Sequence, residues 1–176
     1  LAGINYSDDW TKDLEFMSSY NFTNAVTKND SKSNQLSLLP TGNILTEADS
    51  ETRNENTGNK VNFELEYKIN PTMQIVFAPK LNLSESNNNA ESSTFSQNEN
   101  GDALNESTAT SHTESSNTSF ANSINFNKTF KKQSRNLSVV FNNNNTKNDS
   151  NGINISETIF YQDNKPNDER NQNAKN

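Results

Sequence analysis

The chain has 176 residues, of which 28% are hydrophobic, with a formal net charge of −7 and no Cys. A soluble domain would have roughly 45–50% apolar residues, and 22 Asp and Glu against 15 Lys and Arg exclude a basic nucleic-acid-binding surface. This composition is typical of disorder, but ten Phe and four Tyr, many at regular spacing, favour a folded chain.

The sequence contains no targeting segment or membrane-spanning helix that we can recognise. No apolar run reaches the roughly 18 residues that a transmembrane helix needs. Residues 1–6 lack the basic start of a signal peptide. We interpret the chain as beginning within a strand and ending in the polar tail 164–176, so both ends look cut.

Apolar residues recur at every second position, which is the period of a β-strand with one apolar face. Segment 60–69 shows this most clearly, because Val61, Phe63, Leu65 and Tyr67 alternate with polar residues. None of the segments has the three- and four-residue apolar spacing of a helix. The sequence therefore predicts an all-β fold, an antiparallel meander of about six long strands, near residues 1–6, 13–26, 60–69, 73–84, 118–130 and 136–142.

The predicted connections alternate between short turns and long polar stretches. Short turns are expected near 7–12, 70–72 and 131–135, and long external loops over roughly 24–60, 85–118 and 142 onward. This alternation is typical of transmembrane β-barrels. Apolar stretches of ~9–11 residues suit a tilted strand that crosses the hydrocarbon layer. We therefore expect the whole chain, 1–176, to be part of a transmembrane β-barrel, with several strands continuing past the membrane as hairpins.

A barrel strand turns one face to lipid and the other to the lumen. The predicted lipid-facing residues are apolar or aromatic: Leu14, Phe16, Tyr20, Phe22, Val61, Phe63, Leu65, Tyr67, Ile75, Phe77, Leu81, Ile124, Phe126, Leu137, Val139 and Phe141. The predicted lumen-facing residues are polar: Glu15, Glu64, Glu66, Lys68, Lys80 and Asn125. Glu64 and Glu66 lie two residues apart on one strand, which favours a charge ladder with a neighbouring strand over acid–base chemistry.

Two segments resemble a known family. Residues 59–71, Asn-Lys-Val-Asn-Phe-Glu-Leu-Glu-Tyr-Lys-Ile-Asn-Pro, resemble a strand-to-turn motif of the TonB-dependent-receptor-like outer-membrane β-barrel family of Bacteroidota. Residues 128–138 resemble that family's second recurring turn, in which Gly more usually stands in place of Ser134.

The resemblance implies a segment of a receptor or transporter in the Gram-negative cell outer membrane, with TonB-linked uptake of a solute. The implied partners are membrane lipid, the remainder of the same barrel, its plug domain, and TonB through segments outside this sequence. No single residue of this chain takes over a transport role from the family, because the plug and the TonB-contacting segment lie outside this sequence.

We predict no catalytic residue, no cofactor-binding residue and no metal site, and therefore no enzyme. His112 is the only His in a chain without Cys, whereas a zinc site needs several such ligands. A Ser–His–Asp hydrolase would need that same His, and the sequence has no Gly-x-Ser-x-Gly elbow. His112 is interpreted as an exposed residue of a loop or strand.

Acidic residues give no clear cation site. Residues 98–102 begin like a calcium loop, but Ala109 stands where the EF-hand register needs a bidentate acid. A loop tip turned by Gly101 is the preferred interpretation. Nothing in the spacing of three late acidic residues requires a cation: Asp163, Asp168 and Glu169.

The predicted turn at 131–135 is basic, with Lys131, Lys132 and Arg135. These cations suit either contact with anionic lipid headgroups or a plain solvated turn, and the sequence leaves both open. Lys128 falls on the predicted lipid-facing side near this turn, where a long side chain can extend its ammonium to the membrane interface.

The alternative function is a secreted Asn/Ser-rich, β-structured adhesin or surface protein. A β-solenoid would show a short fixed repeat, and none is found. A soluble β-sandwich would bury the apolar face against a second sheet. The test is what covers that face: burial under a facing layer would contradict the membrane interpretation at Phe63, Leu65, Ile75, Phe77 and Phe126.

Overall fold

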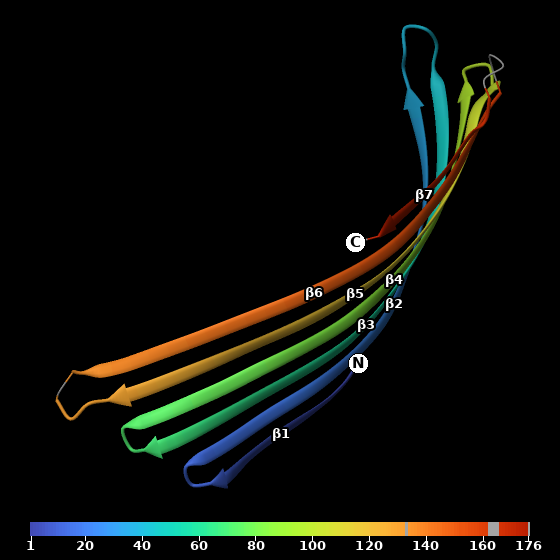
Figure 1. Ribbon diagram of the computed structural model, residues 1–176. Coiled ribbons are helices and arrows are strands. Elements are labelled where there is room, and N and C mark those ends of the chain that lie inside the picture. Colours follow the sequence, from blue (N-terminus) through green and yellow to red (C-terminus); the bar gives the residue numbers. More distant parts are fainter. Residues whose placement is uncertain (133, 162–165, 176) are drawn as a thin grey trace. The chain divides into compact units, whose positions relative to one another are not determined.

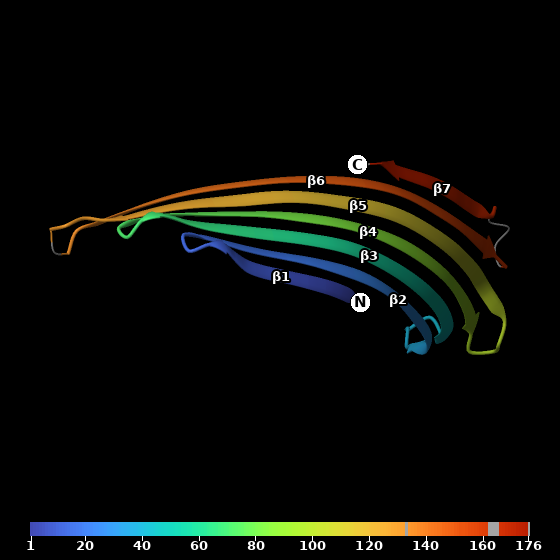
Figure 2. The same ribbon diagram turned by 90° about the horizontal axis from the view of Figure 1, so that it is seen from below.

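The structure is a computed structural model that describes residues 1–132, 134–161 and 166–175. It is all-β, with these strands: β1 Ala2–Thr11, β2 Leu14–Ser37, β3 Ile44–Asn70, β4 Met73–Asn98, β5 Ala103–Thr129, β6 Asn136–Phe160 and β7 Asp168–Lys175. They form one sheet in the order β1-β2-β3-β4-β5-β6-β7, each beside its chain neighbour (Figures 1 and 2). The prediction of an all-β antiparallel meander is confirmed. Over the described residues its strands number seven, and the sheet that they form is not closed into a barrel.

The described residues contain no helix long and apolar enough to cross a membrane. They divide into two compact units, each built from parts of several strands. Unit 1 comprises Leu1–Asn24, Thr57–Glu85 and Ser116–Asn148. Unit 2 comprises Ala25–Asn56, Ser86–Ser115 and Asp149–Asn176. The turns that join β1 to β2, β3 to β4 and β5 to β6 all belong to unit 1, and the other three connections belong to unit 2.

The strands are longer than their apolar segments. β3 begins at Ile44 instead of 60, β5 at Ala103 instead of 118, and β6 ends at Phe160 instead of 142. The structure thus places strand through most of the stretches predicted as long external loops, and β7 lies in the predicted polar tail. The reason is that Asn, Ser and Thr occupy both faces there, so a period of two leaves no contrast in hydropathy.

Aromatic contacts across three strands accompany the β1–β2 register in unit 1. Antiparallel pairing sets Tyr6 opposite Ser18 and Asp8 opposite Phe16. The ring of Phe16 stacks on Trp10 with centroids 4.6 Å apart, and it lies 5.9 Å from Tyr6 and 6.0 Å from Phe63. Such cross-strand aromatic pairs are worth about 0.5–1.5 kcal/mol each beyond area burial. They oppose a slip in register, which would turn these rings to the other face.

The described residues have no hydrophobic core. None of their hydrophobic side chains is buried, and Ser96 is the single buried polar residue. Phe63 and Phe77 are 44% and 40% exposed, and Leu65, Ile75 and Phe126 are intermediate. A soluble domain normally buries the apolar face of a sheet against another layer. Here the described strands form a single layer, which differs from a β-sandwich.

The turn between β5 and β6 contains a non-glycine residue with a left-handed backbone, Ser134, whose φ is 64°. The turn is closed by two backbone hydrogen bonds, from the N–H of Phe130 to the carbonyl of Arg135 at 2.9 Å and from that of Arg135 to Lys132 at 3.2 Å. Gly is the residue for which this conformation is unstrained.

Ser134→Gly is therefore expected to raise the free energy of unfolding by about 0.5–1 kcal/mol. The left-handed conformation costs an L-residue ~1–2 kcal/mol, and the greater flexibility of unfolded Gly offsets part of the gain. Urea unfolding measures the change. Ser134→Val is the matched control and should lose stability, because β-branched residues resist positive φ. A Gly variant no more stable than wild type would contradict this account of the turn.

Candidate functional site

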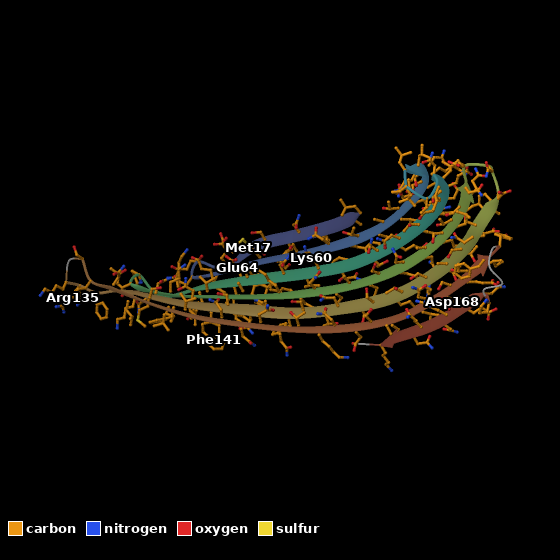
Figure 3. The ribbon with its side chains drawn as sticks, turned by 90° about the horizontal axis from the view of Figure 1, so that it is seen from above. Met17, Lys60, Glu64, Arg135, Phe141 and Asp168 are labelled. Atoms are coloured by element: carbon orange, nitrogen blue, oxygen red, sulfur yellow. The ribbon has the colours of Figure 1, made fainter. Side chains whose placement is uncertain are left out.

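The candidate site is the two-faced sheet of unit 1. Every predicted lipid-facing and lumen-facing residue lies in this unit. Successive side chains of a strand point to opposite faces. Figure 3 shows Met17, Lys60 and Glu64 on one side of the sheet and Phe141 on the other.

Side-chain contacts connect these alternating faces between strands. Phe16 contacts Phe63, and the Tyr20 hydroxyl donates to Asn59 Oδ1 at 2.7 Å, so the aromatic sides of β2 and β3 coincide. On the opposite side, Asn62 Nδ2 donates to Ser19 Oγ at 2.9 Å.

The apolar face, as we call it, carries the residues predicted to face lipid. None of them is buried, and exposure is greatest on β6, where Val139 is 52% and Phe141 57% exposed. The other residues of the apolar face are partly covered by neighbouring rings and aliphatic side chains of the same layer. Unit 1 therefore presents a broad apolar surface, contributed by β2 to β6, which the described residues leave uncovered.

The polar face lies on the opposite side. Residues of this face line a shallow hollow of about 420 Å³ together with Tyr6, Ser18 and Phe63: Asn5, Ser7, Met17, Ser19, Asn62, Glu64 and Lys80. Glu66 pairs with Lys68 of the same strand, Oε1 to Nζ 3.5 Å, instead of the cross-strand ladder that we predicted. Asn125 accepts a hydrogen bond from Ser138 at 3.4 Å. This face is rich in hydrogen-bonding groups and carries both signs of charge.

Unit 2 has polar side chains on both faces, and these bond between neighbouring strands. Thr46 and Ser96 join β3 to β4 through their hydroxyls at 3.1 Å, and Ser107 and Thr158 join β5 to β6 at 3.1 Å. Within the described part of the chain, no buried side-chain nitrogen or oxygen lacks a partner. These contacts were not predictable from the sequence, because side-chain pairing depends on strand register and leaves no mark on hydropathy.

The residues considered for metal binding or catalysis are separate from one another. No group of three or more potential metal ligands occurs among the described residues. His112 bonds Asn89 Oδ1 through Nδ1 at 2.7 Å and faces Glu114 Oε1 through Nε2 at 3.3 Å. Asp168 pairs with Arg170 at 2.8 Å, and Asp163 lies outside the described residues.

Residues 98–102 form the connection between β4 and β5. Asn98 Oδ1 accepts hydrogen bonds from the backbone N–H groups of Asn100 and Asp102, both at 2.9 Å, and Gly101 has φ 85°. This is the geometry of an Asx-type turn. The Asn98 side-chain oxygen therefore accepts hydrogen bonds from the backbone of this turn.

Comparison with known proteins adds no family. No protein-family model and no curated protein sequence matches the chain. Among solved structures, the chain aligns with the membrane pore complex of pneumolysin at 8% identity and a TM-score of 0.19. That alignment covers 98% of this chain and 45% of that one. A TM-score this low carries no argument about fold or function.

Tyr161, which follows β6 in unit 2, has a raised pKa. Its hydroxyl donates to Glu106 Oε2 at 2.8 Å, and its backbone N–H donates to the Leu104 carbonyl at 3.1 Å. The hydrogen bond to Glu106, then desolvation, then the negative charge of Glu106 raise the pKa of Tyr161 above its ordinary 10.0. The folded chain therefore favours the neutral phenol.

We expect Glu106→Gln to lower the pKa of Tyr161 back toward 10.0. The stabilisation from this contact is present below the pKa of the unfolded state and is lost as the pH rises through the higher folded value. Tyrosinate absorbance against pH measures the shift, and Tyr161→Phe identifies which of the tyrosine titrations belongs to this residue. The same Tyr161 midpoint in wild type and Glu106→Gln would contradict the assignment.

Proposed function

We propose that this chain is a wall segment of a Gram-negative outer-membrane β-barrel receptor or transporter, of the TonB-dependent-receptor-like type found in Bacteroidota. The observation that carries the proposal is the uncovered apolar face of unit 1, opposite a polar face on the same single layer. Hydrocarbon would contact the apolar face, and the polar face would line the lumen. Uptake of a solute linked to TonB rests on the resemblance of residues 59–71 and 128–138 alone.

The energetics favour lipid as the cover of the apolar face. Apolar surface left in water costs about 25 cal/mol per Å². Contiguous exposed patches beyond a few hundred Å² typically mark sites that contact a membrane or another protein. A strand with apolar side chains outward and polar ones inward is the pattern of membrane barrels, and ~9–11 such residues span the hydrocarbon layer. The apolar segments of β3, β4 and β5 have this length.

The strand edges of unit 1 are open, and we infer that further strands pair with them. β1 pairs with β2, and β7 pairs with β6 only over Asn151 to Thr158. Among the described residues, β7 therefore does not pair with the part of β6 from Asn136 to Thr146, which lies in unit 1. Unpaired backbone groups are too costly in hydrocarbon. We infer that the remainder of the same barrel pairs with these edges, and that a plug domain fills the lumen.

Reconstitution tests this proposal against the secreted adhesin. The parent barrel that contains this chain, diluted from urea into phosphatidylcholine vesicles, should sediment with the vesicles, resist alkaline extraction and dissolve only with detergent. Its electrophoretic mobility should change on boiling, as that of folded membrane barrels does. Recovery as a detergent-free soluble monomer would rule out the barrel and support the adhesin.

A charge on the apolar face should be costly in lipid. We expect Phe63→Lys to lower the free energy of unfolding in vesicles by about 2–4 kcal/mol, because an ammonium in mid-bilayer loses its hydration. Glu64→Lys, one residue along on the polar face, is the matched control and should cost under about 1 kcal/mol. Urea titration in vesicles measures both. Equal costs at the two positions would contradict a lipid-facing and a polar side.

A further inference from the structure

The β5–β6 turn of unit 1 concentrates positive charge on an acidic chain. Lys128, Lys131, Lys132 and Arg135, together the basic turn, lie within eight residues of a chain whose net charge is −7. The other two short turns of unit 1 differ. Asp8, Asp9 and Asp13 surround the β1–β2 turn, and the β3–β4 turn is the neutral Pro71-Thr72.

Within the described part of the chain, the four cations of the basic turn have no acidic partner. Elsewhere in unit 1, Lys12 lies 3.9 Å from Asp13 and Lys68 lies 3.5 Å from Glu66. Among the residues that the structure describes, no carboxylate lies within ion-pairing distance of Lys128, Lys131, Lys132 or Arg135. An unpaired cluster of this kind attracts anions from solution.

The backbone holds the cluster together at the tip of the turn. The hydrogen bonds Phe130 N–H to Arg135 O and Arg135 N–H to Lys132 O bring the two ends of the turn together. Lys131, Lys132 and Arg135 are exposed, and Figure 3 shows Arg135 at this tip. Three charged side chains therefore share one small solvent-facing region.

The basic turn adjoins the apolar face. Lys128 follows Ile124 and Phe126 at two-residue spacing on β5, so it lies on the same face as they do, at the end nearest the turn. Its Nζ lies 5.1 Å from the centroid of the Phe130 ring, a cation–π geometry. Aromatic rings and long cationic side chains gather where hydrocarbon meets headgroups. Apolar surface beside phosphate-binding charge fits a lipid more closely than a soluble anion.

We propose that the basic turn binds the phosphates of anionic phospholipid headgroups at the rim of the lipid-embedded unit. Arg135 can donate two parallel hydrogen bonds to one phosphate, and Lys131 and Lys132 supply charge beside it. Lys128 occupies the boundary between headgroup and hydrocarbon. This inference rests on the proposed function, since it takes the apolar face to be in lipid, and it adds a lipid class and a site.

The experiment measures binding of the full chain to two kinds of vesicle, phosphatidylcholine alone and phosphatidylcholine with phosphatidylglycerol. The emission of Trp10, the single Trp, reports binding. Each Lys or Arg beside an anionic surface contributes about fivefold in affinity. Lys131→Gln, Lys132→Gln and Arg135→Gln together should therefore weaken binding to the anionic vesicles on the order of 100-fold, and leave binding to neutral vesicles unchanged.

The matched control removes the same charge elsewhere in unit 1, through Lys12→Gln, Lys60→Gln and Lys80→Gln. Each triple variant removes three of the 15 cations and takes the net charge from −7 to −10. The control should keep most of the preference for anionic vesicles. Replacing chloride with inorganic phosphate at equal ionic strength should not abolish the preference, since the site is assigned to headgroups.

The outcomes separate the two proposals. Equal losses in both triple variants, or a wild-type chain with no preference for anionic vesicles, would overturn the headgroup site and leave the membrane proposal standing. Loss of the preference in phosphate buffer would assign the turn to free phosphate and would also overturn it. A chain that binds neither kind of vesicle would instead overturn the proposed function.

Discussion

The constraint on which the rest depends is that the described strands form one layer, and one layer cannot cover its own apolar face. In unit 1, rings and aliphatic side chains from neighbouring strands shield one another at their sides and stay open outward. A soluble fold would solve this with a second sheet or a helix. The interpretation of this face as lipid-facing depends on that constraint. The assignment of the adjoining basic turn to lipid headgroups depends on it too.

Without a core, order must come from contacts within the layer. Backbone ladders satisfy the peptide groups, and side chains on each face bond across strands. In unit 1 these are the Phe16 contacts and the Ser19–Asn62 hydrogen bond. In unit 2 they are hydroxyl pairs such as Ser107–Thr158. The polar composition that suggests disorder thus supplies the cross-strand bonds.

Part of the structure was predictable from the sequence, because hydropathy contrast reveals period two wherever apolar and polar residues alternate. Residues 60–69 and 73–84 were predicted as strands for this reason, and they lie in β3 and β4. The parts of the strands that lie in unit 2, and β7, were not predicted as strands, because Asn, Ser and Thr occur on both faces there and give no contrast in hydropathy. The Tyr161–Glu106 contact depends on strand register, which no local pattern encodes. Ser134 has a positive φ, a conformation that Gly adopts more readily and that a Ser in the sequence does not signal.

The most direct test of the apolar face is a spin-label scan along β3. The chain has no Cys, so single Cys residues can be placed at each position from 60 to 69 and labelled in vesicles. Collisions with oxygen, which concentrates in hydrocarbon, should peak at Val61, Phe63, Leu65 and Tyr67. Collisions with a water-soluble nickel complex should peak at the positions between them. Equal access of the nickel complex to both sets would contradict the account.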